Sequence, residues 1–107
     1  SVIHPDKTVV VGTGVYAAIP EGFVGLVMPR SGLASRGIVA VPGTIDSGYR
    51  GEIKVVLHNT GNEPYTVCKH DRIAQLEILP VVRAQFDVVS DLGATERGSE
   101  GLGSTGR

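Results

Sequence analysis

Short apolar runs rich in β-branched residues, each bounded by Gly, Pro, Asn or Asp, are the feature that most restricts how this chain can fold. The sustained period of about 3.6 residues that an amphipathic helix requires is absent from the sequence. We expect strands within residues 7–20, 23–29, 38–45, 52–59, 65–69, 72–82 and 85–89. The 107 residues have room for one domain, and the spacing of the runs predicts an all-β barrel or sandwich.

One short helix is expected in "SGLASRG", residues 31–37. Ser31 can act as its N-cap, Gly37 can take the left-handed position after its last turn, and Pro29 ends the preceding strand. Arg30 and Ser31 at the start of this helix offer a cation and a hydroxyl to an anion. Taken alone, however, the stretch is better explained as a capped surface helix with a solvated arginine.

The charge balance argues against a nucleic-acid partner. With Lys+Arg 10 and Asp+Glu 11, the net charge is -1, so the chain lacks the basic excess that binds a polyphosphate backbone. A single small anion remains a possible ligand. No apolar run approaches the 18 or so residues of a membrane span, and no charged-then-apolar leader is present, so we expect no membrane partner.

The single cysteine, Cys68, cannot form an internal disulfide, and its apolar neighbours in "YTVCK" predict a small buried thiol. A reducing, cytoplasmic setting fits this composition. His4, His58 and His70 lack the spacing of metal ligands, and no Ser/His/Asp nucleophile arrangement can be recognised. We therefore interpret the three histidines as surface or strand residues and name no metal ligand.

"PGTIDSGYRGEI", residues 42–53, places Asp46 at the mouth of a tight turn. Asp-Ser-Gly is a common turn composition, so the Asp46 carboxylate could simply bond its own backbone. A rigid turn is also a good mount for a general base, because the carboxylate need only reach one water molecule. The turn by itself leaves both interpretations open.

From Thr95 onward the sequence becomes rich in glycine and has no apolar periodicity. We expect a barrel domain over residues 1–94 and a flexible arm over residues 95–107. The arm lacks the Lys-Ser/Thr pair and the following helix of a nucleotide P-loop. Its glycines nevertheless let main-chain amides approach an anion, with Arg97, Ser104 and Thr105 supplying charge and hydroxyls. A disordered terminus would have the same composition.

Four segments are more informative together, and in this order, than each is alone: "PRSGLA" (29–34), "GTIDSGYRGE" (43–52), "DRIAQLEI" (71–78) and "RGSEGLGSTG" (97–106). They resemble motifs 2, 3, 4 and 5 of the trimeric dUTPase family, and the resemblance extends over nearly the whole chain. It implies hydrolysis of dUTP to dUMP and pyrophosphate with Mg²⁺, which limits uracil in DNA and supplies dUMP for thymidylate synthesis. It also implies a β-barrel or jelly-roll subunit that forms a homotrimer.

The resemblance assigns roles to residues of the turn. Asp46 would be the general base that activates the attacking water. The main chain of Gly43, Thr44 and Ile45 would read the uracil edge. Tyr49 would pack under the deoxyribose, so that a 2′-hydroxyl would clash with its ring.

The same resemblance assigns the phosphates to other segments. Arg30, Ser31 and Gly32 would hold the middle phosphate, and Gln75 would contact the phosphate chain. Arg97, Gly103, Ser104 and Thr105 of the arm would close over the terminal phosphate. In the family each site takes motifs 2 and 4 from one subunit, motif 3 from a second and motif 5 from the third.

Two departures from the family pattern accompany the resemblance. Motif 1, an Ala-Gly-x-Asp-Leu segment whose aspartate helps to hold the hydrated metal, would lie upstream of Ser1, so we expect an intact chain to begin earlier. Leu102 stands where the family usually has a phenylalanine that stacks on the uracil. Two alternatives stay open, a dUTP-binding regulator without turnover and a dCTP deaminase-type relative, although Asp46 in this hairpin argues against the deaminase.

Overall fold

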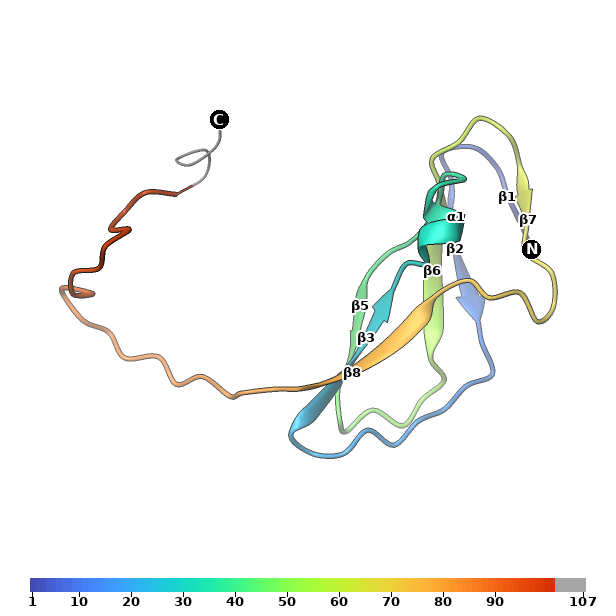
Figure 1. The fold of residues 1–107 in the computed structure, drawn as a ribbon. Helices are drawn as coiled ribbons and strands as arrows, with labels where there is room; N and C mark the ends of the chain where they lie inside the picture. The colour runs from blue at the N-terminus through green and yellow to red at the C-terminus, as the bar shows by residue number, and fades with distance from the viewer. Residues whose placement is uncertain (102–107) are drawn as a thin grey trace.

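The computed structural model describes residues 1–101, which form strands and one helix of a single turn (Figure 1). The elements in chain order are β1 (Val2–Ile3), β2 (Thr8–Gly12), β3 (Phe23–Met28), α1 (Ser31–Ala34), β4 (Ile38–Ala40), β5 (Gly43–Ile45), β6 (Lys54–Asn59), β7 (Tyr65–Thr66) and β8 (Gln75–Pro80). The expected all-β architecture with one short helix is confirmed.

The strands pair antiparallel in three small sheets, in the orders β1-β7, β2-β6-β4 and β5-β3-β8. In the second sheet β6 is central, and Val10 of β2 lies opposite Val56. In the third sheet β3 is central, with Gly25 opposite Ile45 on one side and opposite Ile78 on the other. Most pairings join segments that are far apart in the sequence.

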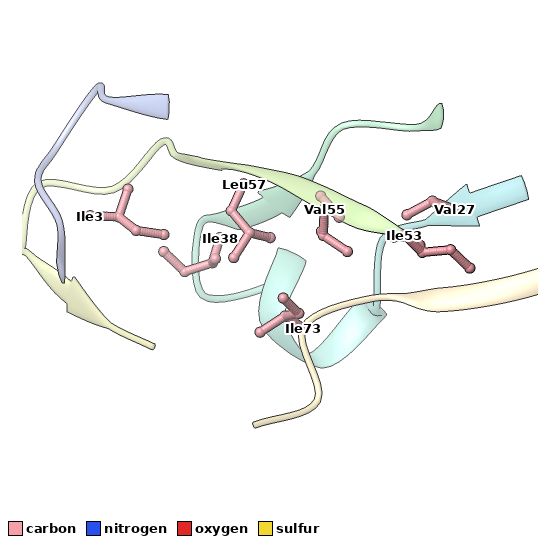
Figure 2. Close-up of a cluster of buried hydrophobic side chains, with 8 residues drawn as sticks. Ile3, Val27, Ile38, Ile53, Val55, Leu57 and Ile73 are labelled. Carbon is pink, nitrogen blue, oxygen red and sulfur yellow. The ribbon is translucent and has the colours of Figure 1, made fainter. Parts of the chain in front are cut away.

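The core follows from the alternation of side chains along the strands. In β6, Val55, Leu57 and Asn59 are buried and the alternating residues Val56 and His58 are partly exposed, as a strand with one face on the core requires. The buried apolar cluster is made of Ile3, Val27, Ile38, Ala40, Ile53, Val55, Leu57 and Ile73. Figure 2 shows a row of these side chains that runs from Ile3 through Ile38, Leu57, Val55 and Ile53 to Val27, with Ile73 below it in this view.

A buried amide ties this core to the loops at one end. Asn59 is 1% exposed, and its Nδ2 donates hydrogen bonds to the main-chain oxygens of Ile3 at 2.9 Å and Glu63 at 2.8 Å. Its Oδ1 accepts a hydrogen bond from the main-chain nitrogen of Gly61 at 2.9 Å. Because a buried polar group without partners is costly, these three bonds explain why the core tolerates an asparagine.

The helix start differs from the expectation. Arg30 occupies the N-cap position, Ser31 is the first helical residue, and no side-chain capping bond forms. The prediction of Ser31 as the N-cap was therefore wrong: Arg30 is the last extended residue, with φ -94° and ψ 134°, and Ser31 is already helical, so the helix begins one residue earlier than expected. Gly37 does take the left-handed conformation, with φ 86°. No helix within residues 1–101 has the length and apolarity to cross a membrane.

The thiol of Cys68 is exposed, which corrects the prediction of a buried cysteine. Tyr65 and Val67 pack against the core and Thr66 between them is exposed, so the alternation along this segment places Cys68 on the exposed side with Thr66. The main-chain nitrogen of Cys68 donates a hydrogen bond to Oδ2 of Asp71 at 2.8 Å.

Residues 81–101 run away from the sheets in an extended path (Figure 1). The strand predicted at residues 85–89 does not form, because nothing in the described chain lies beside this segment to pair with it; Phe86 is 92% exposed and Leu92 is 94% exposed. The Cα radius of gyration is 18.9 Å, against about 13 Å for a compact chain of this length. Within residues 1–101 the last strand ends at Pro80, and the division into residues 1–94 and 95–107 stays a prediction.

Candidate active site

The turn after β5 presents Asp46 to solvent. The main-chain nitrogen of Tyr49 donates to the main-chain oxygen of Asp46 at 3.0 Å and closes the turn. Nη1 of Arg50 donates to the main-chain oxygens of Ser47 at 2.7 Å and Tyr49 at 3.1 Å, which braces the same turn. Within residues 1–101 no hydrogen bond engages the Asp46 carboxylate, so it is not the group that holds the turn. The exposed carboxylate is therefore available to a water molecule.

Tyr49 is fixed at its hydroxyl end. The ring is 41% exposed, and its hydroxyl donates to the main-chain oxygen of Glu52 at 2.7 Å. The Glu52 carboxylate in turn accepts a hydrogen bond from the main-chain nitrogen of Gly14 at 2.8 Å. The Tyr49 ring is thus tethered to Glu52, and Glu52 is itself bound to the segment after β2.

Arg30 and Gln75 lie on neighbouring segments. Met28 at the end of β3 is opposite Gln75 at the start of β8, and the Gln75 side-chain nitrogen donates to the main-chain oxygen of Pro29 at 2.8 Å. Arg30 follows Pro29 directly and is half-buried, whereas Ser31 and Gly32 are exposed. One chain therefore brings together the residues that the sequence assigns to motifs 2 and 4.

A cavity of about 700 Å³ opens beside this pair of segments. Its lining includes Arg30 and Gln75, the loop 68–72, and apolar side chains of the core such as Val27 and Val55. Neither Asp46 nor Tyr49 lines it. Within one chain, the candidate phosphate ligands and the candidate base thus belong to different surfaces.

The strand register gives the scale of this separation. Val27 lies opposite Gly43, and from that pair β3 leads toward Arg30 while antiparallel β5 leads the other way toward Asp46. Since a strand rises about 3.3 Å per residue, Arg30 and Asp46 are about 20 Å apart along the strand direction. A single chain therefore cannot place both side chains on the same phosphate group.

Arg97 belongs to residues 81–101, the segment that runs away from the sheets (Figure 1). Its Nε donates to the main-chain oxygen of Glu100. Leu102, Gly103, Ser104 and Thr105 lie outside the described residues. The roles expected for these arm residues stay predictions.

A family model described as dUTPase matches residues 1–106. The chain belongs to the dUTPase family. A deoxyuridine 5'-triphosphate nucleotidohydrolase of Cutibacterium acnes is 56% identical over 108 residues, which cover 97% of this chain and 71% of that protein.

Solved dUTPases share the fold as well. The structure of a Staphylococcus bacteriophage 80alpha dUTPase with dUPNHPP matches with a TM-score of 0.93 and 30% identity, covering 100% of this chain and 80% of that one. A mutant dUTPase from phage phi11 of S. aureus, whose description names a structural Mg(II) ion, matches with a TM-score of 0.80 and 27% identity over 86% of this chain and 78% of that one. The dUTPase-like fold expected from the sequence is confirmed.

The dUTPase resemblance implies Mg²⁺, so we looked within residues 1–101 for side chains that could hold this ion. Within residues 1–101 no three His, Cys, Asp or Glu side chains group closely enough to hold a metal ion. Mg²⁺ bound to a nucleotide usually keeps several waters and takes one or two carboxylates together with substrate phosphates. The described residues do not fit a preformed magnesium site.

Three residues of the dUTPase hairpin gained a role only from the structure: Arg50 braces the turn, Glu52 tethers Tyr49, and Gly51 lies against the Tyr49 ring. All three stand in "YRGE", directly after the residues singled out in the sequence. Their proximity to Asp46 was the available signal, but the contacts depend on how the turn folds.

Proposed function

We propose that this chain is a dUTP diphosphatase, which hydrolyses dUTP to dUMP and pyrophosphate. The observation that carries the proposal is the dUTPase family match over residues 1–106, and curated relatives with the nucleotidohydrolase name support it. Limiting uracil in DNA and supplying dUMP for thymidylate synthesis belong to the same proposal. The exposed free thiol of Cys68 favours a reducing compartment, and we place the protein in the cytoplasm.

Asp46 is proposed as the general base. Its exposed carboxylate takes a proton from a water molecule, and the water oxygen attacks the α-phosphorus. The bond between that phosphorus and its bridging oxygen breaks, and pyrophosphate leaves with the electron pair. The turn contributes by holding the carboxylate in place through main-chain bonds, so that Asp46 keeps its oxygens for the water.

Uracil recognition is proposed for the main chain of β5. In the described chain β5 pairs only with β3, so its outer edge carries amide and carbonyl groups without strand partners. Such an edge can meet a nucleobase as a base-pairing partner would, with Gly43, Thr44 and Ile45 supplying the groups. Tyr49 beside this edge would pack under the deoxyribose.

The phosphates are assigned to Arg30, Ser31, Gly32 and Gln75. Arg30 is the cation of this set, and phosphoryl transfer asks a protein mainly for positioning and charge neutralisation. Mg²⁺, when bound, would share in neutralising the phosphates. Because the described residues supply no preformed site, we propose that the ion arrives with the substrate.

A homotrimer is proposed because one chain leaves the site divided. Arg30 and Asp46 are about 20 Å apart along the strands, so one phosphate chain must meet them from different subunits. Strand β8 exposes Leu76, Ile78 and Leu79, and residues 81–92 add further exposed apolar side chains that a neighbouring chain can cover. Residues 95–107 would then be the arm that brings Arg97, Leu102, Gly103, Ser104 and Thr105 to a neighbour's site.

Pyrophosphate release measured with dUTP, dCTP and dTTP tests the proposal. We expect release from dUTP and far less from the other two nucleotides. Ammonia release from dCTP would identify a deaminase-type relative instead. Binding of dUTP without any pyrophosphate release would identify a regulator that has lost turnover, and either result would overturn the proposed activity.

A further inference from the structure

Gly51 lies directly against the ring of Tyr49. A Cβ atom at position 51 would be 2.5 Å from the Tyr49 hydroxyl oxygen, 2.7 Å from Cζ and 3.1 Å from Cε1. Carbon atoms that are not bonded meet at about 3.5–4.0 Å, so a side chain at this position cannot coexist with the ring where it stands. Gly51 is not among the residues with positive φ, so the ring, and not the backbone, requires a glycine here.

The ring cannot move aside without losing its anchor. The Tyr49 hydroxyl donates to the main-chain oxygen of Glu52 at 2.7 Å, and the Glu52 carboxylate accepts from the nitrogen of Gly14 at 2.8 Å. The next residue, Ile53, donates its main-chain nitrogen to the oxygen of Val15 at 2.8 Å. Residues 52 and 53 are thus bound to the segment after β2, and the anchor does not follow a displaced ring.

We propose that Gly51 is a positioning residue for substrate selection: its missing side chain leaves room for the hydroxyl end of the Tyr49 ring against the main chain, and so holds the ring where it admits deoxyribose and rejects ribose. The inference rests on the proposed function. A methyl group at position 51 lifts the ring and breaks its bond to Glu52. Because the ring is 41% exposed, it has room to move outward, so the change disturbs the substrate site more than the core.

Gly51→Ala is the direct test, and Gly48→Ala is its matched control. A Cβ atom at Gly48 in the same turn would meet nothing within 4 Å, and Gly48 is not among the glycines with positive φ. For each variant we would measure kcat and KM for dUTP and UTP, together with thermal unfolding. A displacement of about 1 Å can cost up to a hundredfold, so we expect Gly51→Ala to lower the dUTP/UTP ratio of kcat/KM by about ten- to a hundredfold, with a raised KM for dUTP. Gly48→Ala should leave the ratio unchanged.

Tyr49→Phe removes the atom nearest to the added methyl group and keeps the test open if Gly51→Ala folds poorly. In the Tyr49→Phe background the further loss of ratio caused by Gly51→Ala should be smaller than in the parent. An active parent whose ratio is unaffected by Gly51→Ala, or equal losses in both backgrounds, would overturn the inference and leave the proposed function intact. A parent that neither binds nor hydrolyses dUTP would overturn the proposed function and the role of Gly51 with it.

Discussion

The side-chain nitrogen of Gln75 donates a hydrogen bond to the main-chain oxygen of Pro29, and the two atoms are 2.8 Å apart. The bond links the first residue of β8 to the residue before Arg30, so it orients the segment that we assign to the middle phosphate. Gln75 therefore has two proposed tasks, one toward the protein and one toward the substrate.

Gln75→Ala is expected to raise the KM for dUTP by about tenfold or more, because a hydrogen bond to a charged group is worth roughly 1.5–3 kcal/mol. Steady-state kinetics measure this directly. Glu77→Ala on the same exposed strand is the control and should leave KM unchanged. An equal KM for Gln75→Ala and the parent would remove Gln75 from the phosphate site.

Asp46→Asn should lower kcat by about 10²–10⁴-fold, the usual cost of losing a general base. Binding of a non-hydrolysable dUTP analogue should persist, since main-chain and Arg50 bonds hold the turn and none of them uses the carboxylate. Pyrophosphate release and calorimetric binding separate the two effects. If the Asn variant turns over at the parental rate, Asp46 is only a turn residue.

Mixed trimers test whether a site is shared between chains. Asp46→Asn and Arg97→Ala homotrimers should each be nearly inactive, the first without its base and the second without a charge on the terminal phosphate. When the two are unfolded and refolded together at equal ratio, about a quarter of all sites in cyclic trimers draw both intact residues from different chains. Activity should rise toward that fraction.

One result with the refolded mixture of Asp46→Asn and Arg97→Ala chains would contradict the shared site. If sizing and mass spectrometry show mixed trimers whose activity is only the average of the two homotrimers, then Asp46 and Arg97 of one site come from one chain. A refolded parent sample prepared in parallel controls for losses during refolding.

Asn59→Leu should destabilise the fold by about 2–5 kcal/mol, because it removes three hydrogen bonds and leaves the buried main-chain oxygen of Ile3 without its Asn59 partner. Denaturant unfolding at one fixed protein concentration measures the loss, since assembly would otherwise shift the midpoint. Exposed Asn62→Leu is the matched control and should change stability by no more than about 0.5 kcal/mol. A small effect of Asn59→Leu would mean that other partners take over these bonds.

The strands that could be predicted from the sequence are those whose burial pattern is local. Alternation in β6 and the apolar run of β3 identify a half-buried and a central strand without reference to the rest of the chain. The two-residue strand β1 was not predicted because, within residues 1–101, it pairs only with β7, which lies far along the sequence. Residues 85–89 were predicted as a strand that does not form. Their composition favours a strand, but a strand also needs a neighbouring strand to pair with, and composition does not show whether one is present.

The candidate site also combines features that could be predicted from the sequence with features that could not. Asp46 and Tyr49 could be proposed from the motif in which they stand, and their place in one turn agrees with the local turn composition. The contact of Gly51 with the Tyr49 ring could not be predicted from the sequence, because it depends on the direction that the Tyr49 side chain takes once the turn has formed. The distance between Arg30 and Asp46 likewise follows from the pairing of β3 with β5, which neither segment encodes alone.

The place of β3 in its sheet also bears on how the protein is made. β3 lies between β5 and β8, and β8 ends at Pro80. A nascent chain emerges from the ribosome with its N-terminus first, and pairing between distant segments is slow. The amides and carbonyls on one edge of β3 therefore stay unpaired until β8 has been synthesised. A chain whose translation stalls before β8 would offer that edge to other nascent chains, so β8 is the last segment the ribosome must deliver before β3 is protected from aggregation.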